Sequence, residues 1–293
     1  MPAATIARVS ANDTKMIVGS CRPESVRPLV IQGAVDHWPA STKWSFEYFR
    51  THHYDDFGRL QLDFHGNVQK LTKLGTFIDN LDDPLSELPG FWLDKSGKPL
   101  KGELEFDPDQ IWSFHVGLLD QHPEMLQDIQ PFPAGIPNLL VQMPQSTQDL
   151  IRSIVGSSIF SIYISRKGTV TPFHIDHSST HGCLVQFAGR KQVYLAPKEP
   201  QADPGKPDFD PMSEEYAGDQ LQSAILQPGE MLLIPPDWWH WTKALDHSIT
   251  LSHNYFSEFN LPRFLAHLIA NARELPDNDT LKSKIEQCLE ELQ

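Results

Sequence analysis

Alternating apolar and polar residues predict a β-rich region in the second half of the chain. Residues 159–165, with the sequence IFSIYIS, alternate as expected of a strand with one buried face, and Arg166–Gly168 reads as the turn after it. Pro228–Glu230 predicts a further turn, and the apolar run Met231–Ile234 that follows it ends at Pro235. Short strands separated by turns are therefore expected in this region.

Apolar residues at helical spacing predict helices on both sides of the β-rich region. Before it, Trp44–Phe49 and Leu71–Leu81 have this spacing, and the second segment has an apolar face made of Leu74, Phe77, Ile78 and Leu81. After it, two amphipathic helices are expected on either side of Pro276, with apolar stripes formed by Leu261, Phe264, Leu265, Leu268, Ile269, Leu281, Ile285, Leu289 and Leu292. We expect the earlier helices to pack outside the sheets.

The length of 293 residues permits one large domain with a substantial core. We expect residues 1–260 to form this domain, including its N-terminal helical additions. Residues 261–293 then form a C-terminal helical pair, which could dock on its own domain or on a second copy of the chain.

The charge balance bears on the partners of the chain. It has 38 acidic and 24 basic residues, a formal net charge of −14 and no basic cluster, so no nucleic-acid partner is expected. No run of about 18 apolar residues exists, so no membrane span is expected. Met1–Arg22 also lacks the apolar stretch of a signal peptide. The three scattered cysteines fit a reducing compartment, and we expect a cytoplasmic location.

An acidic segment, Lys198–Asp219, holds seven acidic residues, two basic residues and four prolines. This composition predicts a long loop between strands, and such loops often carry substrate contacts. A basic substrate is one interpretation of its charge; a solvated loop without a binding role is the other.

The candidate chemistry lies in the segment TPFHID, Thr171–Asp176, and in a later histidine, His240. His174 and Asp176 are two residues apart, so on a strand their side chains would share one face. Two imidazoles and one carboxylate are the ligand set of non-haem Fe(II) oxygenases, which leaves three positions of the metal open. The chain has 13 histidines, so the triplet by itself is weak; its position next to predicted strands strengthens the interpretation.

Five segments together resemble the JmjC-domain, or cupin-like, 2-oxoglutarate oxygenases. They are residues 27–40 with Trp44, the segment TPFHID, residues 186–195 as a strand, residues 228–240 and the closing strand 248–254. Among these enzymes the chain most resembles the small hydroxylase branch typified by the asparaginyl hydroxylase that acts on hypoxia-inducible factor. The resemblance runs from about residue 25 to about residue 260. It implies a mainly β fold: a double-stranded β-helix (jelly-roll) barrel with flanking N-terminal helices and the C-terminal helical pair, which builds a homodimer in that branch.

The resemblance also implies roles for particular residues. His174, Asp176 and His240 match the Fe(II) ligands, and Thr171 and Lys191 match the residues that hold the distal carboxylate of 2-oxoglutarate. A lysine suits this role because a dicarboxylate that chelates iron at one end needs a cation at the other.

Two further residues match cosubstrate contacts less directly. Asn254 corresponds to an asparagine near the metal, although it could equally be a turn residue that ends its strand. Tyr163 lies on a strand whose inward residues touch the cosubstrate in this family. The alternative for Lys191 is an exposed strand lysine, with Arg190 as the competing cation.

The sequence departs from the branch at two places. The spacing from His174 to Lys191 is about two residues longer, which predicts a different loop over Ser178–Gly182. The family tyrosine that binds 2-oxoglutarate from an earlier strand has no clear match, because Gln110–Leu118 offers Trp112, Ser113 and His115 there.

These observations lead to one interpretation with open alternatives. We expect a dioxygenase that uses Fe(II), 2-oxoglutarate and O₂ to hydroxylate a C–H bond of a protein or peptide side chain, and a homodimer formed through residues 261–293. A free amino acid or a biosynthetic small molecule is the alternative substrate. Demethylation proceeds by the same chemistry. A metal-binding cupin without oxygenase activity, or a hydrolytic metal enzyme, is disfavoured because it has no need for a dicarboxylate cradle such as Thr171 and Lys191. The motifs do not encode the substrate.

Overall fold

The computed structural model describes most of the chain, with the exception of several loops and the two ends. The described residues are 3–61, 68–84, 87–94, 96–100, 114–155, 159–176, 179–197, 211, 220–274 and 279–291. The predicted acidic loop over Lys198–Asp219 lies almost entirely outside them, as do Trp112 and Ser113.

The second half of the described chain forms a barrel of consecutive strands. Their bounds are β8 Phe160–Ser165, β9 Val170–His174, β10 His181–Ala188, β11 Lys191–Ala196, β12 Gln222–Leu226, β13 Glu230–Ile234, β14 Trp239–Ala244 and β15 Ser248–Tyr255. The first half contributes the shorter strands β1 Ala4–Thr5, β2 Arg8–Ser10, β3 Leu29–Gln32, β4 Phe57–Gln61, β5 Val68–Lys73, β6 Phe91–Asp94 and β7 Phe114–Val116.

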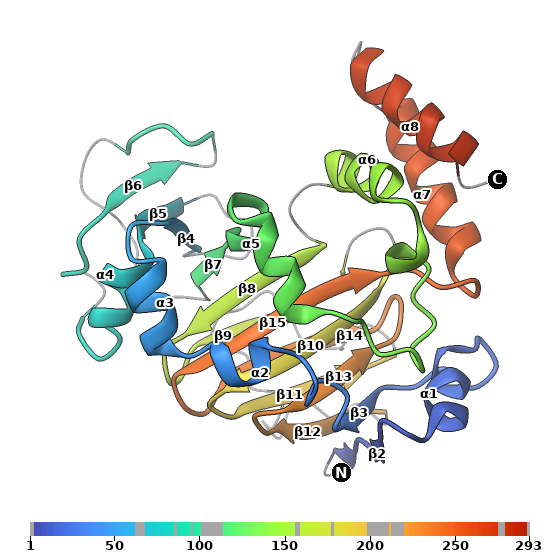
Figure 1. The fold of residues 1–293 in the computed structure, drawn as a ribbon, viewed down its shortest axis with the longest axis horizontal. Helices are drawn as coiled ribbons and strands as arrows, with labels where there is room; N and C mark the ends of the chain where they lie inside the picture. Colours follow the sequence, from blue (N-terminus) through green and yellow to red (C-terminus); the bar gives the residue numbers. More distant parts are fainter. Residues whose placement is uncertain are drawn as a thin grey trace.

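The helices lie mostly outside the strands (Figure 1). The α-helices are α1 Thr14–Cys21, α2 Ala40–Lys43, α3 Phe46–His52, α4 Leu74–Asp79, α5 Leu118–Gln121, α6 Gln145–Val155, α7 Leu261–Glu274 and α8 Asp279–Glu291. Two 3₁₀ helices, η1 Pro123–Ile129 and η2 Leu140–Gln142, connect α5 to α6. Among the described residues, no helix is long and apolar enough to cross a membrane.

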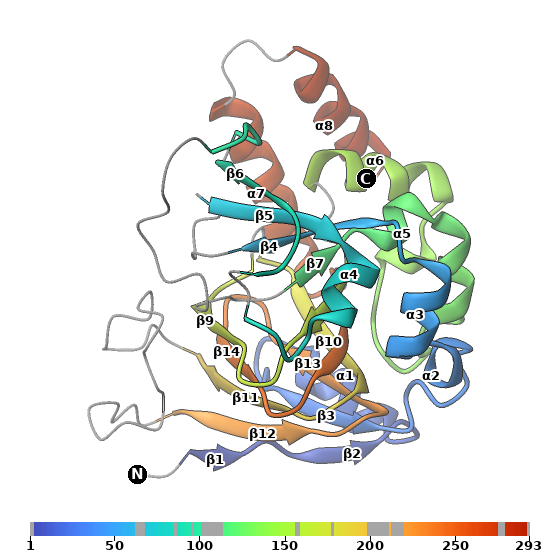
Figure 2. The ribbon, with the colours of Figure 1, turned by 90° about the vertical axis from the view of Figure 1, so that its left-hand side faces the viewer.

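Two sheets face each other and enclose the barrel interior (Figure 2). Within the described residues, the smaller sheet has the strand order β1-β12-β11-β14-β9, and the larger has β2-β3-β13-β10-β15-β8-β7-β4-β5-β6. From β8 to β11, successive strands alternate between the two sheets, as in a double-stranded β-helix. The predicted fold class is therefore confirmed.

A mixed apolar core fills the barrel between the sheets. On β11, Val193 and Leu195 point into it together with Leu232 and Ile234 of the opposite sheet, while Tyr194 packs on the other face of β11. This alternation follows from the period of two along a strand. Lys191 has the same parity as Val193 and therefore points to the interior.

The predicted strand segments do form β-strands, but the bounds of one of them were wrong. Residues 159–165 and 248–254 form β8 and β15. Residues 186–195 are not one strand, because Gly189 adopts φ +66° and turns the chain from β10 in one sheet to β11 in the other. Only glycine adopts this conformation readily.

The N-terminal half holds strands that the sequence pattern did not indicate. β4 to β7 continue the larger sheet from β8 outward, and β3 pairs with β13 at its other side. Leu71 was expected at the start of a helix, but it pairs with Arg59 of β4 and Phe91 of β6. The helix α4 begins at Leu74, and the predicted apolar face is buried as expected: Leu74, Phe77, Ile78 and Leu81.

The C-terminal helical pair is present and packs on its own chain. α8 contacts α6 and α7, and these three helices gather at one end of the sheets (Figure 1). Phe264 of α7 and Ile285 of α8 are each 1% exposed and belong to the main core. The homodimer expected through residues 261–293 stays a prediction.

Candidate metal centre

His174 and His240 face each other across neighbouring strands of the smaller sheet. His174 is the last residue of β9, His240 is the second residue of β14, and the two are register partners in an antiparallel pair. Directly opposed side chains on one face of such a pair lie close together. The ring centroids are accordingly 4.0 Å apart.

Backbone carbonyls fix the orientation of both imidazole rings. Nδ1 of His174 lies 2.9 Å from the carbonyl oxygen of Pro172, and Nδ1 of His240 lies 3.1 Å from that of Trp238. A carbonyl only accepts hydrogen bonds, so each Nδ1 must carry the proton. Each Nε2 then presents its lone pair, which is the arrangement that metal-binding histidines use.

Asp176 completes the group. Its Oδ1 lies 3.9 Å from Nε2 of His174 and 3.7 Å from Nε2 of His240. Both distances exceed those of hydrogen bonds, so the carboxylate and the imidazoles converge without bonding to each other. The three ligand atoms lie within 4.8 Å of one another, close enough for one ion to contact all three. Asp176 was expected on the same strand as His174, but β9 ends at His174 and Asp176 lies in the segment that follows.

The missing side chain of Gly182 leaves room for the carboxylate of Asp176. A Cβ on Gly182 would lie 2.9 Å from Oδ2 of Asp176 and 3.6 Å from Oδ1 of Asn254. No side chain other than hydrogen fits there without displacing the carboxylate. Ser178–Gly182 was expected to form a loop, but β10 begins at His181, so Gly182 belongs to a strand. No local sequence pattern indicated this role of Gly182.

Asn254 lies on the same side of Gly182 as this carboxylate. It is the register partner of Gly182 on β15. Its Oδ1 is buried, and no described residue offers it a hydrogen-bond donor. A buried acceptor of this kind costs free energy unless a ligand or a water satisfies it. Asn254 is therefore suited to bind a ligand at the metal.

A bulge in β9 places Thr171 on the interior face. Residues three apart on a regular strand point to opposite faces, so Thr171 and His174 would be separated. The register between β9 and β14 shifts at this point: His174 faces His240, whereas Thr171 faces Thr242. Because His240 and Thr242 share one face, the extra residue brings Thr171 and His174 to the same side.

Lys191 is a buried cation in the barrel interior. It is 6% exposed, and burial lowers the pKa of its ammonium group from 10.5 to about 8. Among the described residues, no acidic side chain forms an ion pair with it. The competing cation, Arg190, is exposed and pairs with Asp246 at 2.7 Å. Lys191 is thus the residue available to an anionic ligand.

Tyr163 and His115 line the same interior from the larger sheet. Burial raises the pKa of Tyr163 to about 12, and the charge of Asp176 adds to this increase. His115 of β7 faces Tyr163 in register, with the rings 5.3 Å apart. Its Nε2 lies 2.9 Å from Oγ of Ser161, and burial lowers its pKa to about 4, so the imidazole is neutral at pH 7. His115 therefore occupies the earlier strand where the family tyrosine was missing.

The donor set fits iron. Two neutral imidazole nitrogens and one carboxylate oxygen converge from one side, as a non-haem Fe(II) site with open positions requires. His240 is buried, whereas His174 and Asp176 are partly exposed, with side-chain exposures of 25% and 23%. The centre can thus be reached from outside on that side.

Comparisons with known proteins agree with this geometry. A family described as a cupin-like domain matches residues 118–261. "Lysine-specific demethylase 8" of Xenopus tropicalis is 27% identical over 254 residues, which cover 77% of this chain and 47% of that protein. "Lysine-specific demethylase JMJ30" of Arabidopsis thaliana is 26% identical over 247 residues, covering 79% of this chain and 50% of that protein.

A third relative carries the cofactors in its name. "2-oxoglutarate and iron-dependent oxygenase JMJD4" of Mus musculus is 30% identical over 115 residues, which cover 34% of this chain and 27% of that protein. The chain spans about half the length of the curated relatives that it matches over most of its own length. Residues 118–261 thus match a cupin-like domain, and together with the barrel and its group of two histidines and one aspartate these matches support a relationship to the JmjC family of iron- and 2-oxoglutarate-dependent oxygenases.

Proposed function

We propose that this chain hydroxylates a C–H bond of a protein or peptide side chain, with Fe(II) held by His174, Asp176 and His240. The observation that carries the proposal is the convergence of two Nε2 atoms and one carboxylate oxygen at the barrel interior. When bound, the iron supplies the oxidative chemistry by which O₂ and 2-oxoglutarate yield succinate, CO₂ and a hydroxylated product.

The residues around the centre bind and orient the cosubstrate. Lys191 offers a buried ammonium group to the distal carboxylate, and Thr171 offers a hydroxyl from the neighbouring face of β9. The ammonium group of Lys191 is buried and has no ion-pair partner among the described residues, and the distal carboxylate would compensate its charge. Asn254 would satisfy its buried Oδ1 with a donor at the metal, such as a bound water.

Tyr163 would serve as a neutral hydrogen-bond donor. With a pKa of about 12 it keeps its proton at pH 7, so its hydroxyl can donate to a carboxylate oxygen of the cosubstrate. His115 faces it from β7 and is neutral as well. The larger sheet therefore supplies hydrogen-bonding groups to the site through Tyr163 and His115 without adding charge.

The names of the relatives support a protein substrate. Two of them are called lysine-specific demethylases, and another, of Arabidopsis thaliana, is called an arginine-specific demethylase. Removal of an N-methyl group begins with hydroxylation of the methyl C–H bond, so the same centre serves either outcome. Demethylation of a basic side chain is therefore the second candidate function. A free amino acid or other small molecule is the alternative substrate.

The first experiment measures succinate formed from 2-oxoglutarate. Protein reconstituted anaerobically with Fe(II) is exposed to air beside His174→Ala and Lys191→Ala, with Lys243→Ala as the matched control because Lys243 is exposed on the adjacent strand. We expect wild type and Lys243→Ala to form succinate and the other two variants to lose it. Equal turnover by wild type and His174→Ala would contradict the proposed ligands.

A second experiment separates the substrate classes. The reconstituted protein is given matched sets of unmodified peptides, methylated peptides and free amino acids, with mass spectrometry of the products. Gain of one oxygen atom by a peptide supports hydroxylation, and release of formaldehyde supports demethylation. Turnover confined to free amino acids would rule out a protein substrate.

A further inference from the structure

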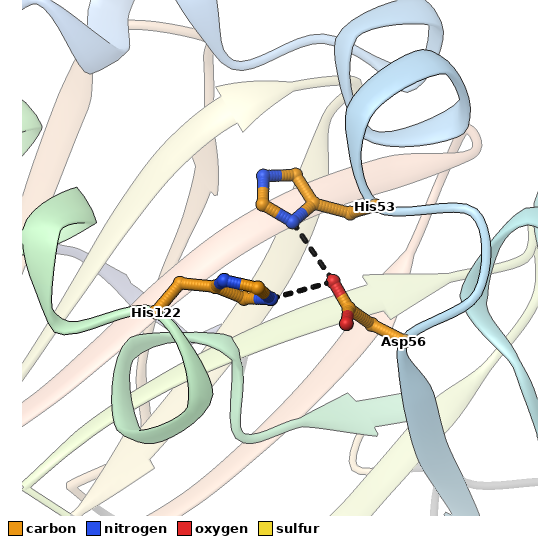
Figure 3. Close-up of side chains that lie close together, drawn as sticks. All are labelled: His53, Asp56 and His122. Atoms are coloured by element: carbon orange, nitrogen blue, oxygen red, sulfur yellow. Dashed lines mark hydrogen bonds and ion pairs between the residues drawn. The ribbon is translucent and has the colours of Figure 1, made fainter.

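A second group of possible metal ligands lies apart from the centre at His174. His53, Asp56 and His122 bring two imidazole nitrogens and one carboxylate oxygen within 4.8 Å of one another (Figure 3). Among the described residues, these are the two groups with such an arrangement. The proposed oxygenase chemistry uses none of the three residues.

Two segments of the chain supply the second group: the connection between α3 and β4, and the end of α5. His53 ends α3, where its backbone N–H donates to the carbonyl oxygen of Phe49. Asp56 precedes β4, and its carbonyl oxygen accepts from the backbone N–H of Leu74 at 2.7 Å. His122 ends α5, far away in the sequence. Because backbone hydrogen bonds hold each segment, the fold itself brings the three side chains together.

The three ligand atoms converge on one point. Nδ1 of His53 lies 2.9 Å from Oδ2 of Asp56, and Nε2 of His122 lies 2.8 Å from the same oxygen. Figure 3 shows both rings turned toward this atom from different sides. The ring centroids are 4.8 Å apart, with the planes inclined by 68°. One carboxylate oxygen between two imidazole nitrogens is a donor set that zinc and related divalent ions prefer.

The outward nitrogen of each ring also has a partner. Nδ1 of His122 lies 3.5 Å from Oε1 of Glu124, and Nε2 of His53 lies 3.5 Å from the hydroxyl of Tyr48. Metal-binding histidines commonly donate their second N–H to a carboxylate or another oxygen. The two inward contacts have hydrogen-bond lengths, so each ring donates to Asp56 in this structure. A bound ion would take the place of these two protons, and each ring would then carry its proton on the outward nitrogen. Glu124 and Tyr48 lie within reach of these outward nitrogens and could accept those protons.

We propose that His53, Asp56 and His122 form a second metal site, which takes Zn²⁺ or a similar divalent transition-metal ion. The ion ties the end of α3 to the end of α5 and to the start of β4. His53 is buried, whereas His122 and Asp56 have side-chain exposures of 31% and 22%. An ion can therefore enter from the side of His122, and a water completes a four-coordinate site.

The experiment counts the metal ions bound by the full-length chain after chelator treatment. Zn²⁺ is titrated into wild type, Asp176→Ala, Asp56→Asn and the double variant, with calorimetry for the affinity and elemental analysis for the number of ions. Asp55→Asn is the matched control, because Asp55 is next in the chain and its carboxylate is exposed and pairs with Lys73.

We expect two ions in wild type and in Asp55→Asn, one in each other single variant, and none in the double variant. An Asp176→Ala protein that binds no ion, or an Asp56→Asn protein that still binds two, would overturn the proposal. Failure of the His174 centre gives a different pattern, since wild type then binds one ion and Asp56→Asn binds none. The two proposals therefore fail separately.

Two further measurements keep the test independent of folding defects. Glu124→Gln changes an exposed side chain that lies beside Nδ1 of His122. In the Asp176→Ala background this change should weaken Zn²⁺ binding by about tenfold, because the hydrogen-bond partner of a metal-binding histidine contributes to metal affinity. An unchanged affinity for Zn²⁺ would contradict a role of Glu124 in supporting His122 as a ligand. Zn²⁺ should also raise the Tm of Asp176→Ala and leave that of the double variant unchanged. Equal shifts in both would show that the ion acts elsewhere.

Discussion

At the scale of single residues, Lys191 shows how function conflicts with stability. An ammonium group in the barrel interior with a pKa of about 8 disfavours the folded state at neutral pH, because the unfolded chain carries the same charge in water. An anionic ligand bound at Lys191, as proposed above, would offset this cost.

We expect Lys191→Met to stabilise the ligand-free protein and to abolish 2-oxoglutarate binding. The shift from 10.5 to about 8 corresponds to about 3 kcal/mol of unfolding free energy as an upper value. The penalty in wild type is complete below about pH 8 and is relieved as the pH rises toward 10.5, because the unfolded chain then binds more protons. Denaturant unfolding at several pH values measures this, and the two proteins should become more alike above pH 8. Lys243→Met is the control.

The same shift predicts the pH dependence of cosubstrate binding. Only the protonated form of Lys191 attracts the distal carboxylate, so affinity should fall by about tenfold for each pH unit above the pKa in the free protein. Anaerobic calorimetry with 2-oxoglutarate between pH 7 and pH 9 checks this. An affinity that stays constant across that interval would exclude Lys191 as the carboxylate partner.

Gly182 is a residue whose importance lies in the atoms that it lacks. Gly182→Ala places a Cβ against Oδ2 of Asp176, and displacement of the carboxylate should weaken metal binding at the His174 centre by about tenfold or more, as changes around a ligand commonly do. Calorimetric titration with a divalent ion in the Asp56→Asn background measures that centre alone. Gly19→Ala is the control, since nothing lies within 4 Å of the added atom, and it should leave the affinity unchanged.

At the scale of elements, the C-terminal helices are fastened by a few buried side chains. Ile285 of α8 is 1% exposed and belongs to the main core. We expect Ile285→Ala to cost about 2 kcal/mol or more of unfolding free energy, since truncation leaves a cavity. Faster hydrogen exchange confined to α7 and α8 would accompany this loss. Unchanged exchange would mean that α8 does not depend on this contact.

At the scale of the whole molecule, the oligomeric state is the open prediction. The apolar stripes over residues 261–293 were expected to build a homodimer, yet Phe264 and Ile285 are already buried within one chain. Ala266 of α7 is exposed, so a dimer formed through this helix would place it at or near the interface. Sedimentation velocity should show a dimer for wild type and a monomer for Ala266→Arg. A monomeric wild type would contradict the expected homodimer.

The sequence by itself determined several elements and the residue types of the centre. Alternation predicted β8, helical spacing predicted α4, α7 and α8, and the motif around His174 and Asp176 indicated the metal chemistry, whereas β15 was expected from the family resemblance. These signals are local: a period of two or 3.6 along the chain records which face of an element is buried. The resemblance to the family added the barrel.

Only the tertiary structure decided which residues meet. The bulge in β9 that brings Thr171 to the side of His174, the contact between Gly182 and Asp176, and the meeting of His53 with His122 each depend on the register between segments far apart in the sequence. The strands β4 to β7 likewise exist because each finds a partner in the larger sheet. Strand pairing is set by non-local contacts, so no local pattern in one sequence records it.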